Sequence, residues 1–216
     1  MGGPRRVEAA SGLSRRSFLK GMGAGALAAG AIAPAEVLAR STAQQKGPKL
    51  LGPEPVAIKL QVNGKERALS LEPRVTLLDA LRNHLDLTGA KKVCDRATCG
   101  SCTVLLDGKA VYSCTVLAIE AQGRKVETVE GLAESAAGKT SDKDGLARMQ
   151  RCFVENDGQQ CGFCTPGFVM ACESFRRGHP KATREQVVAG LGGNLCRCGT
   201  YHGVTHAVLD AIGGGA

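Results

Sequence analysis

The chain is poor in aromatic residues, which make up 3% of its 216 residues, and it has no tryptophan. A core with few large rings relies on aliphatic side chains and stays modest in size. Bound metal clusters would compensate, because a metal that binds the folded chain adds its binding free energy to folding. Hydrophobic content of 43% and charged content of 22% are otherwise ordinary for a globular protein.

Several signatures of enzymes and membrane proteins are also missing from the sequence. It has no Walker loop and no dinucleotide-binding fingerprint, and it shows no serine or cysteine nucleophile with a base partner. The apolar run over residues 21–33 is too short and too rich in glycine and alanine for a stable membrane span. The sequence therefore shows no catalytic motif of these classes.

The formal net charge of +8 is a balance that can indicate nucleic-acid binding. Five of the basic residues, however, lie within the first 39 residues: Arg5, Arg6, Arg15, Arg16 and Lys20. The rest of the chain has no basic run interleaved with aromatic residues, which is the pattern that nucleic-acid sites use. We expect no nucleic-acid partner.

Residues 1–39 have the form of a bacterial export signal. The stretch Ser14-Arg15-Arg16-Ser17-Phe18-Leu19-Lys20 precedes the weakly apolar residues 21–33, and small residues follow near position 39. This is the twin-arginine (Tat) pattern, and its alternative is a chance arginine pair before an amphipathic helix. The pattern predicts a periplasmic protein, exported folded, with a flexible linker over residues 40–54.

Ten cysteines are the most informative residues of the chain. One quartet combines a C-x2-C pair with a C-x-C pair: Cys161, Cys164, Cys196 and Cys198. The other quartet begins with the C-x4-C-x2-C spacing of plant-type 2Fe–2S ferredoxins: Cys94, Cys99, Cys102 and Cys114. Four converging thiolates indicate a metal site, so the quartets predict two 2Fe–2S clusters. Cys152 and Cys172 lie in helical patterns and are predicted to be buried packing residues.

Three other roles for the cysteines compete with iron–sulfur binding. The C-x2-C pair is typical of thioredoxin-like dithiols, but no strand–helix context surrounds it. The quartet of Cys161, Cys164, Cys196 and Cys198, taken alone, also suits a structural zinc ion. Disulfides are the usual fate of cysteines in exported proteins; a Tat substrate that folds around its clusters before export would avoid them.

Hydrophobic periodicity divides the chain into two parts. Residues 56–62 alternate as a strand, Asn63-Gly64 predicts a hairpin turn, and residues 66–70 are the returning strand. A helix follows from Thr76, then a cysteine-rich loop over 89–102, a hairpin over 103–112 and further strand residues at Val116, Ile119 and 125–129. This order predicts a ferredoxin domain over residues 55–130.

Residues 131–143 are predicted to be a domain junction, because the period becomes helical after them. Leu146, Met149, Phe153 and Val154 share one helical face. Further helices are predicted from Thr165-Pro166 to Gly178, from Thr183 to Leu191, and around residues 206–212. We expect an α+β protein whose residues 144–216 form an all-α cluster domain.

Three motifs in order resemble the small iron–sulfur subunit of molybdenum hydroxylases, the xanthine dehydrogenase and aldehyde oxidoreductase family. They are residues 94–104 (CDRATCGSCTV), 160–167 (QCGFCTPG) and 193–198 (GNLCRC). The resemblance covers about residues 55–212. It implies a β-grasp ferredoxin domain followed by a four-helix-bundle 2Fe–2S domain.

The resemblance also implies a mechanism. A large partner subunit holds a molybdopterin cofactor, where the substrate is hydroxylated with oxygen from water. Electrons then pass to the cluster of the helical domain, on to the ferredoxin-domain cluster, and finally to an FAD subunit or a c-type cytochrome. Gln160 matches a glutamine beside the pterin, so it is expected to contact that cofactor.

Two positions depart from the family pattern. Ala97 stands where glycine is usual, which carries a steric cost if this position needs a positive φ. Gly199-Thr200-Tyr201 replaces the Thr-Gly-Tyr of xanthine dehydrogenases and resembles periplasmic aldehyde oxidoreductases and isoquinoline- or nicotinate-oxidising enzymes. We expect an aldehyde substrate, with an N-heteroaromatic compound as the alternative. A stand-alone exported 2Fe–2S carrier and a zinc-stabilised binding module are the other classes.

Overall fold

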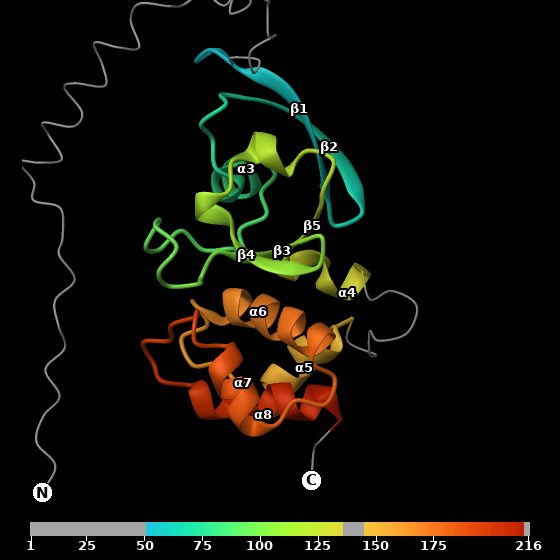
Figure 1. Ribbon diagram of the computed structural model, residues 1–216, viewed down its shortest axis with the longest axis vertical. Coiled ribbons are helices and arrows are strands. Elements are labelled where there is room, and N and C mark those ends of the chain that lie inside the picture. The colour runs from blue at the N-terminus through green and yellow to red at the C-terminus, as the bar shows by residue number, and fades with distance from the viewer. Residues whose placement is uncertain (1–50, 136–144, 214–216) are drawn as a thin grey trace, which may run out of the picture. The chain divides into compact units, whose positions relative to one another are not determined.

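The computed structural model describes residues 51–135 and 145–213. The predicted signal over residues 1–39, residues 40–50 of the linker and residues 136–143 of the junction lie outside the described residues. From Leu51 onward the chain forms one compact unit, in which a sheet-rich part is followed by a helical part (Figure 1). In the part of the chain that is described, no helix combines the length and apolar character needed to cross a bilayer.

The N-terminal part is built on a mixed five-stranded sheet with the order β2-β1-β5-β3-β4. Its strands are β1 (Val56–Val62), β2 (Lys65–Leu71), β3 (Thr103–Leu106), β4 (Lys109–Tyr112) and β5 (Lys125–Glu127). β1 and β5 are parallel, with Gln61 opposite Lys125, and the other neighbours are antiparallel. A helix packed on this mixed sheet gives the β-grasp arrangement, so the predicted ferredoxin fold is confirmed.

Local sequence signals explain the elements around the sheet. Asn63 and Gly64 both have positive φ values, 51° and 75°, as a tight hairpin turn requires. Helix α3 (Leu77–His84) begins after Thr76, whose hydroxyl accepts from the backbone N–H of Asp79 at 3.1 Å. Three leucines of α3 are fully buried in the ferredoxin core: Leu77, Leu78 and Leu81.

The C-terminal part is the predicted set of helices. They are α5 (Arg148–Glu155), α6 (Thr165–Gly178), α7 (Arg184–Gly190) and α8 (Tyr201–Ile212). α6 has a proline in its first turn, and the α7 cap pairs Thr183 with Gln186. η3 (Val129–Gly131) and α4 (Leu132–Ser135) precede them, so the start of the predicted junction is helical.

Three predictions made from the sequence about secondary structure and burial were wrong. Val116 and Ile119 lie outside the strands, because Val116 directly follows the 3-10 helix η1 (Ser113–Thr115) and Ile119 lies in the 3-10 helix η2 (Ala118–Ala121). Val154 is 55% exposed, and the buried face of α5 is formed by Met149, Cys152 and Phe153. The last helix begins at Tyr201, well before the predicted start.

Helix α6 joins the two parts, since it packs against β3 and β4 (Figure 1). Leu105 of β3 belongs to the core of the helical part. On the same helix, Glu173 is buried and accepts hydrogen bonds from Arg176 and Arg177. Arg177 also forms a bidentate pair with Glu127 of β5, both bonds 3.0 Å long. A charged network therefore connects the helical part to the sheet.

Replacing Glu173 with glutamine should destabilise the protein at neutral pH. Burial opposes ionisation of this carboxyl group, but hydrogen bonds from Arg176 and Arg177 outweigh it and hold its pKa below the ordinary value of 4.5. A depressed pKa gives stability that is present above pH 4.5 and is lost as the pH falls through the folded-state pKa. We expect a loss of about 1.5–3 kcal/mol at pH 7 in denaturant unfolding.

The difference between Glu173→Gln and the parent protein should shrink as the pH falls below about 4.5, because the parent carboxylate then takes up a proton. Glu54→Gln is the matched control, since Glu54 is exposed and lies outside this network. A Glu173→Gln variant as stable as the parent at pH 7 would show that the network contributes nothing.

Candidate metal centres

The ferredoxin-domain quartet consists of Cys94, Cys99, Cys102 and Cys114. Cys94 and Cys99 lie in the loop that follows α3 and are partly exposed. Cys102 directly precedes β3, and Cys114 lies in η1 (Ser113–Thr115); both are buried. The sheet thus fixes two of the ligands, and the loop brings the other two toward them.

The helical-domain quartet consists of Cys161, Cys164, Cys196 and Cys198. Cys164 is the residue that precedes α6, and Cys161 lies one turn before it in the same loop. Cys196 and Cys198 lie in the loop between α7 and α8. Cys161 and Cys198 are exposed, whereas Cys196 is buried. One side of this quartet therefore faces outward.

Within each quartet the thiols form two close pairs. The interacting pairs in the ferredoxin domain are Cys94 with Cys99 and Cys102 with Cys114. Those in the helical domain are Cys164 with Cys196 and Cys161 with Cys198. Electrostatic contact also links the pairs of each quartet, Cys99 to Cys102 and Cys161 to Cys164. Such an arrangement suits two irons, each of which takes two thiolates.

The spacing of the sulfurs argues against a single zinc ion. Tetrahedral zinc, with Zn–S bonds of about 2.3 Å, needs all four sulfurs within about 4 Å of one another. Over residues 51–135 and 145–213, the only three His, Cys, Asp or Glu ligand atoms all within 4.8 Å of one another belong to Cys152, Glu155 and Asp210. All ten cysteines are free thiols, which excludes disulfides among the described residues.

Hydrogen bonds prepare one thiol of each quartet for metal binding. The hydroxyl of Thr98 and backbone N–H groups of Arg96 and Thr98 donate to Cys94 and lower its pKa to about 6. Burial opposes ionisation of Cys196, but hydrogen bonds from Thr200 outweigh it and lower the pKa to about 7. Burial raises the pKa of Cys164 to about 12, so binding iron must displace that proton.

The two cluster loops are joined by two hydrogen bonds to backbone carbonyl groups. The N–H of Leu195, beside Cys196, donates to the carbonyl of Cys99 at 2.9 Å. The buried side chain of Asn194 donates to the carbonyl of Gly100, also at 2.9 Å. Cys99, of the ferredoxin-domain quartet, is thus hydrogen-bonded to the residue that precedes Cys196, of the helical-domain quartet. This bond provides a short through-bond connection between the two sites.

Glycine makes this approach of the loops possible. A Cβ on Gly167, in the first turn of α6, would lie 2.4 Å from the carbonyl oxygen of Gly100 and 2.9 Å from the Cα of Ser101. Backbone atoms cannot move aside cheaply, so the position tolerates no side chain. The start of the helix behind Cys164 therefore lies directly on the ferredoxin loop.

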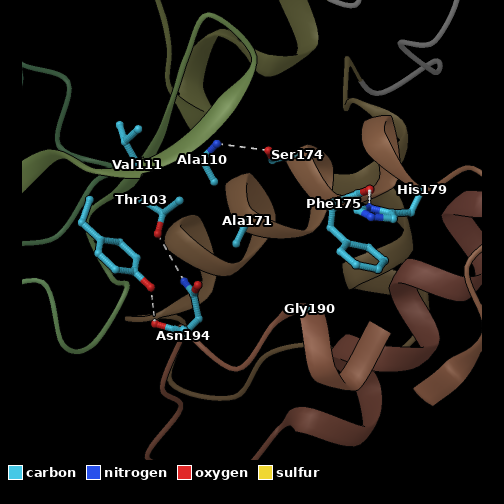
Figure 2. A pocket seen from close by; sticks show the side chains of 11 residues that line it. Thr103, Ala110, Val111, Ala171, Ser174, Phe175, His179, Gly190 and Asn194 are labelled. Atoms are coloured by element: carbon cyan, nitrogen blue, oxygen red, sulfur yellow. Dashed lines mark hydrogen bonds between the residues drawn. The ribbon is translucent and has the colours of Figure 1, made fainter. Parts of the chain in front are cut away.

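A crevice of about 410 Å³ lies where β3 and β4 meet α6 and α7 (Figure 2). Several of its polar groups form hydrogen bonds with one another. Ser174 accepts from the N–H of Ala110, Asn194 donates to Thr103, and Tyr112 donates to the carbonyl of Gly193. These hydrogen bonds connect the sheet to the helical part across the crevice.

A second hollow, also of about 410 Å³, opens beside both quartets and is lined by Cys99, Cys161, Cys164 and Cys196. Its rim carries large apolar side chains that are about half exposed: Val93 at 52%, Phe163 at 55% and Leu195 at 54%. Gln160, predicted to contact the pterin, is exposed in the same loop as Phe163. Exposed apolar groups gathered in one place are typical of a protein–protein interface.

Some residues that shape the site were not predicted from the sequence. Asn194 bridges the two loops, and Thr200 contacts the Cys196 sulfur at 3.2 Å, but nothing in the sequence beyond their place in the motifs indicates either role. The predicted packing role of Cys152 and Cys172 is confirmed, because both are buried in the helical core. Cys152 also lies against the carboxylates of Glu155 and Asp210.

Comparison with known protein families gives two matches that follow the two parts of the fold. Residues 60–133 match a 2Fe-2S iron-sulfur cluster binding domain, and residues 128–209 match a 2Fe-2S binding domain. The chain is therefore a protein with two 2Fe–2S domains, as the two quartets predicted.

Individual relatives narrow this class. The chain is 43% identical to the nicotine 6-hydroxylase small subunit of Paenarthrobacter nicotinovorans, over 73% of this chain and 90% of that protein. It is 35% identical to the aldehyde oxidoreductase iron-sulfur-binding subunit PaoA of Escherichia coli K12, over 93% of this chain and 89% of that protein. The crystal structure of quinoline 2-oxidoreductase from Pseudomonas putida 86 contains a chain with 39% identity and a TM-score of 0.67, covering 74% of this chain and 94% of that one.

This chain belongs to the small iron–sulfur subunits of molybdenum hydroxylases. It is an electron-transfer subunit of an oxidoreductase in the xanthine dehydrogenase family. In these relatives, the molybdopterin cofactor belongs to the large catalytic subunit.

Replacing Ala97 with glycine should stabilise the ferredoxin domain. The structure gives Ala97 a φ of 56°, a left-handed conformation that costs an L-residue about 1–2 kcal/mol. Glycine removes that cost but loses about 0.5–1 kcal/mol through its freedom in the unfolded chain, so a net gain of about 0.5–1 kcal/mol remains. The measurement is the temperature at which the loaded protein loses its ferredoxin-domain cluster absorption.

Ala110→Gly is the control for this substitution, because Ala110 lies exposed in the extended strand β4 and should be destabilised by glycine. If Ala97→Gly lost its cluster at the same temperature as Ala110→Gly, the left-handed alanine would not be a source of strain.

Proposed function

We propose that this chain accepts electrons at its helical-domain quartet from a large molybdopterin-binding subunit and passes them to the ferredoxin-domain quartet. The observation that carries this direction is the difference in exposure. Cys161 and Cys198 are exposed beside an apolar rim, whereas Cys102 and Cys114 are buried. The hydrogen bond from Leu195 to Cys99 supports transfer between the two sites.

Each quartet would hold one 2Fe–2S cluster through its four thiolates, and the clusters supply one-electron carriers. The assigned ligands are Cys94, Cys99, Cys102 and Cys114 in the ferredoxin domain, and Cys161, Cys164, Cys196 and Cys198 in the helical domain. The pairing of the thiols supports this assignment. Exposed Gln160, directly before Cys161, would contact the pterin of the large subunit.

The large subunit would cover the apolar rim formed by Val93, Phe163 and Leu195. Because these side chains surround the hollow that reaches Cys161 and Cys164, a partner bound there would shield the helical-domain ligands from water. A second partner, an FAD subunit or a c-type cytochrome, would take electrons from the ferredoxin domain.

We propose an aldehyde as the substrate of the complex. The relative with the greatest coverage of this chain among those compared above is an aldehyde oxidoreductase subunit, aligned over 93% of the chain. An N-heteroaromatic substrate is the second candidate, because a nicotine 6-hydroxylase subunit and a quinoline 2-oxidoreductase are also similar. In either case the substrate would bind to the large subunit.

The proposed location is the periplasm, reached through the twin-arginine signal at Arg15 and Arg16. Export of a folded, cluster-loaded chain accounts for ten free cysteines in an exported protein. The domains proposed are residues 1–39 as signal peptide, 40–54 as linker, 55–130 as ferredoxin domain, 131–143 as junction and 144–216 as cluster domain.

Replacing Cys164 with serine in the complex with the large subunit tests the proposed electron path. The variant should lose the EPR signal of the helical-domain cluster, keep that of the ferredoxin domain, and turn over at least about tenfold more slowly, since the first acceptor is missing. Cys152→Ser is the control, because Cys152 is buried but belongs to neither quartet.

The parent protein in the same experiment should contain about four irons and co-purify with a molybdenum-containing subunit. Loss of both EPR signals in Cys164→Ser would contradict two separate clusters. A colourless chain that contains zinc would contradict the electron-transfer function. A chain that contains both clusters but never associates with a molybdenum subunit would favour a stand-alone carrier.

Conservative replacement of Arg15 and Arg16 by lysine should stop export. The twin-arginine signal depends on these two residues, so the Arg15→Lys/Arg16→Lys protein should accumulate in the cytoplasm with its clusters bound. Cell fractionation followed by immunoblotting measures the distribution. Arg5→Lys/Arg6→Lys, a second arginine pair in the same segment, should be exported normally; equal export of both variants would refute the proposed signal.

A further inference from the structure

We infer that Thr200 sets the reduction potential of the helical-domain cluster by donating a hydrogen bond to the sulfur of Cys196. This inference rests on the proposed ligand role of Cys196. Thr200 Oγ1 lies 3.2 Å from Cys196 Sγ, and both residues are buried, Thr200 at 7% and Cys196 at 8% exposure. A buried hydrogen bond to a ligand sulfur acts on the electronic properties of the metal site.

The direction of this hydrogen bond follows from the chemistry of the ligand. Between a free thiol and a hydroxyl, either group can donate. A cysteine that binds iron is a thiolate and has no proton, so the hydroxyl of Thr200 must then be the donor. The bond becomes charge-assisted, which makes it roughly twice as strong as one between neutral groups.

The position of Thr200 in helix α8 supports a special role for its hydroxyl. Thr200 is the N-cap residue, where a threonine oxygen normally accepts from a backbone N–H in the first turn. Here the side chain makes no such capping bond. The helix forgoes about 1 kcal/mol of capping stabilisation, while the hydroxyl contacts the sulfur instead.

The neighbouring residues hold the hydroxyl in this place. Gly199 has a φ of 80°, a conformation that β-branched residues avoid. Position 199 therefore favours glycine, and the threonine follows it at position 200. On the other side, Tyr201 accepts from the backbone N–H of Cys196 at 2.9 Å. The segment from Cys196 to Tyr201 therefore folds back on itself and fixes Thr200 against the sulfur.

A donor to a ligand sulfur favours the reduced cluster. Reduction adds one electron, which is partly shared by the sulfur ligands, and a hydrogen bond stabilises that added negative charge. Thr200 thus raises the potential of the helical-domain cluster and makes it a better acceptor for electrons from the large subunit. Thr200 does not touch substrate; it acts through Cys196.

The test is an EPR-monitored redox titration of the loaded complex carrying Thr200→Val. Valine has nearly the same shape but cannot donate, so the midpoint potential of the helical-domain signal should fall by about 59 mV, which is a tenfold shift for one electron. The ferredoxin-domain signal in the same sample is the internal reference and should not move. Thr200→Ser keeps the hydroxyl and should retain the parent potential.

Thr205→Val is the matched control for loss of a buried hydroxyl. Thr205 lies in the same helix at 5% exposure, and its hydroxyl donates to the carbonyl of Tyr201 at 2.8 Å instead of to a sulfur. Both potentials should stay at their parent values in this variant. A fall in Thr205→Val as large as in Thr200→Val would mean that helix packing, not the hydrogen bond, sets the potential.

Two other results would overturn the inference. One is an unchanged helical-domain potential in a fully loaded Thr200→Val complex. The other is failure of both Thr200→Val and Thr200→Ala to bind the helical-domain cluster while Thr200→Ser binds it, which would make the hydroxyl a requirement for holding the cluster. The proposed electron-transfer function fails separately, if the parent complex shows no pair of 2Fe–2S signals.

Discussion

The close backbone contact between the two cysteine loops is the constraint on which the rest of the structure depends. Leu195 donates to the carbonyl of Cys99, and Gly167 allows the first turn of α6 to lie against Gly100 and Ser101. Electron transfer falls off steeply with distance, so a relay needs its two sites held close and rigid. Backbone hydrogen bonds achieve this better than side-chain contacts, because they leave no rotamer freedom at the contact.

The two quartets differ in their surroundings, and the difference agrees with their order in a relay. The ferredoxin-domain quartet has two buried ligands anchored by the sheet, whereas the helical-domain quartet turns Cys161 and Cys198 outward. Val93 belongs to the ferredoxin loop but stands on the rim of the hollow beside the helical-domain ligands. A partner seated there would therefore touch both loops and hold them in their present arrangement.

Much of the fold could be predicted from the sequence, because its signals are local. Asn63-Gly64 specifies a turn by its own backbone preference, Thr76 caps the helix that follows it, and the cysteine spacings belong to short loops. The contacts that were not predicted join residues far apart in the sequence. Nothing near Leu195 indicates that its N–H reaches Cys99, and an apolar Val154 on a helical pattern gives no sign that it is exposed.

The parallel pairing of β1 with β5 has a consequence for how the domain is made. Gln61 and Lys125 are neighbours in the sheet, and all four cysteines of the ferredoxin-domain quartet lie in the chain between them. The central strand pair cannot form until that whole stretch has been synthesised, and closing so long a loop is slow. All four thiols are therefore synthesised before β5, and a nascent chain stalled before residue 125 would present them without the strand that joins β1 to β3.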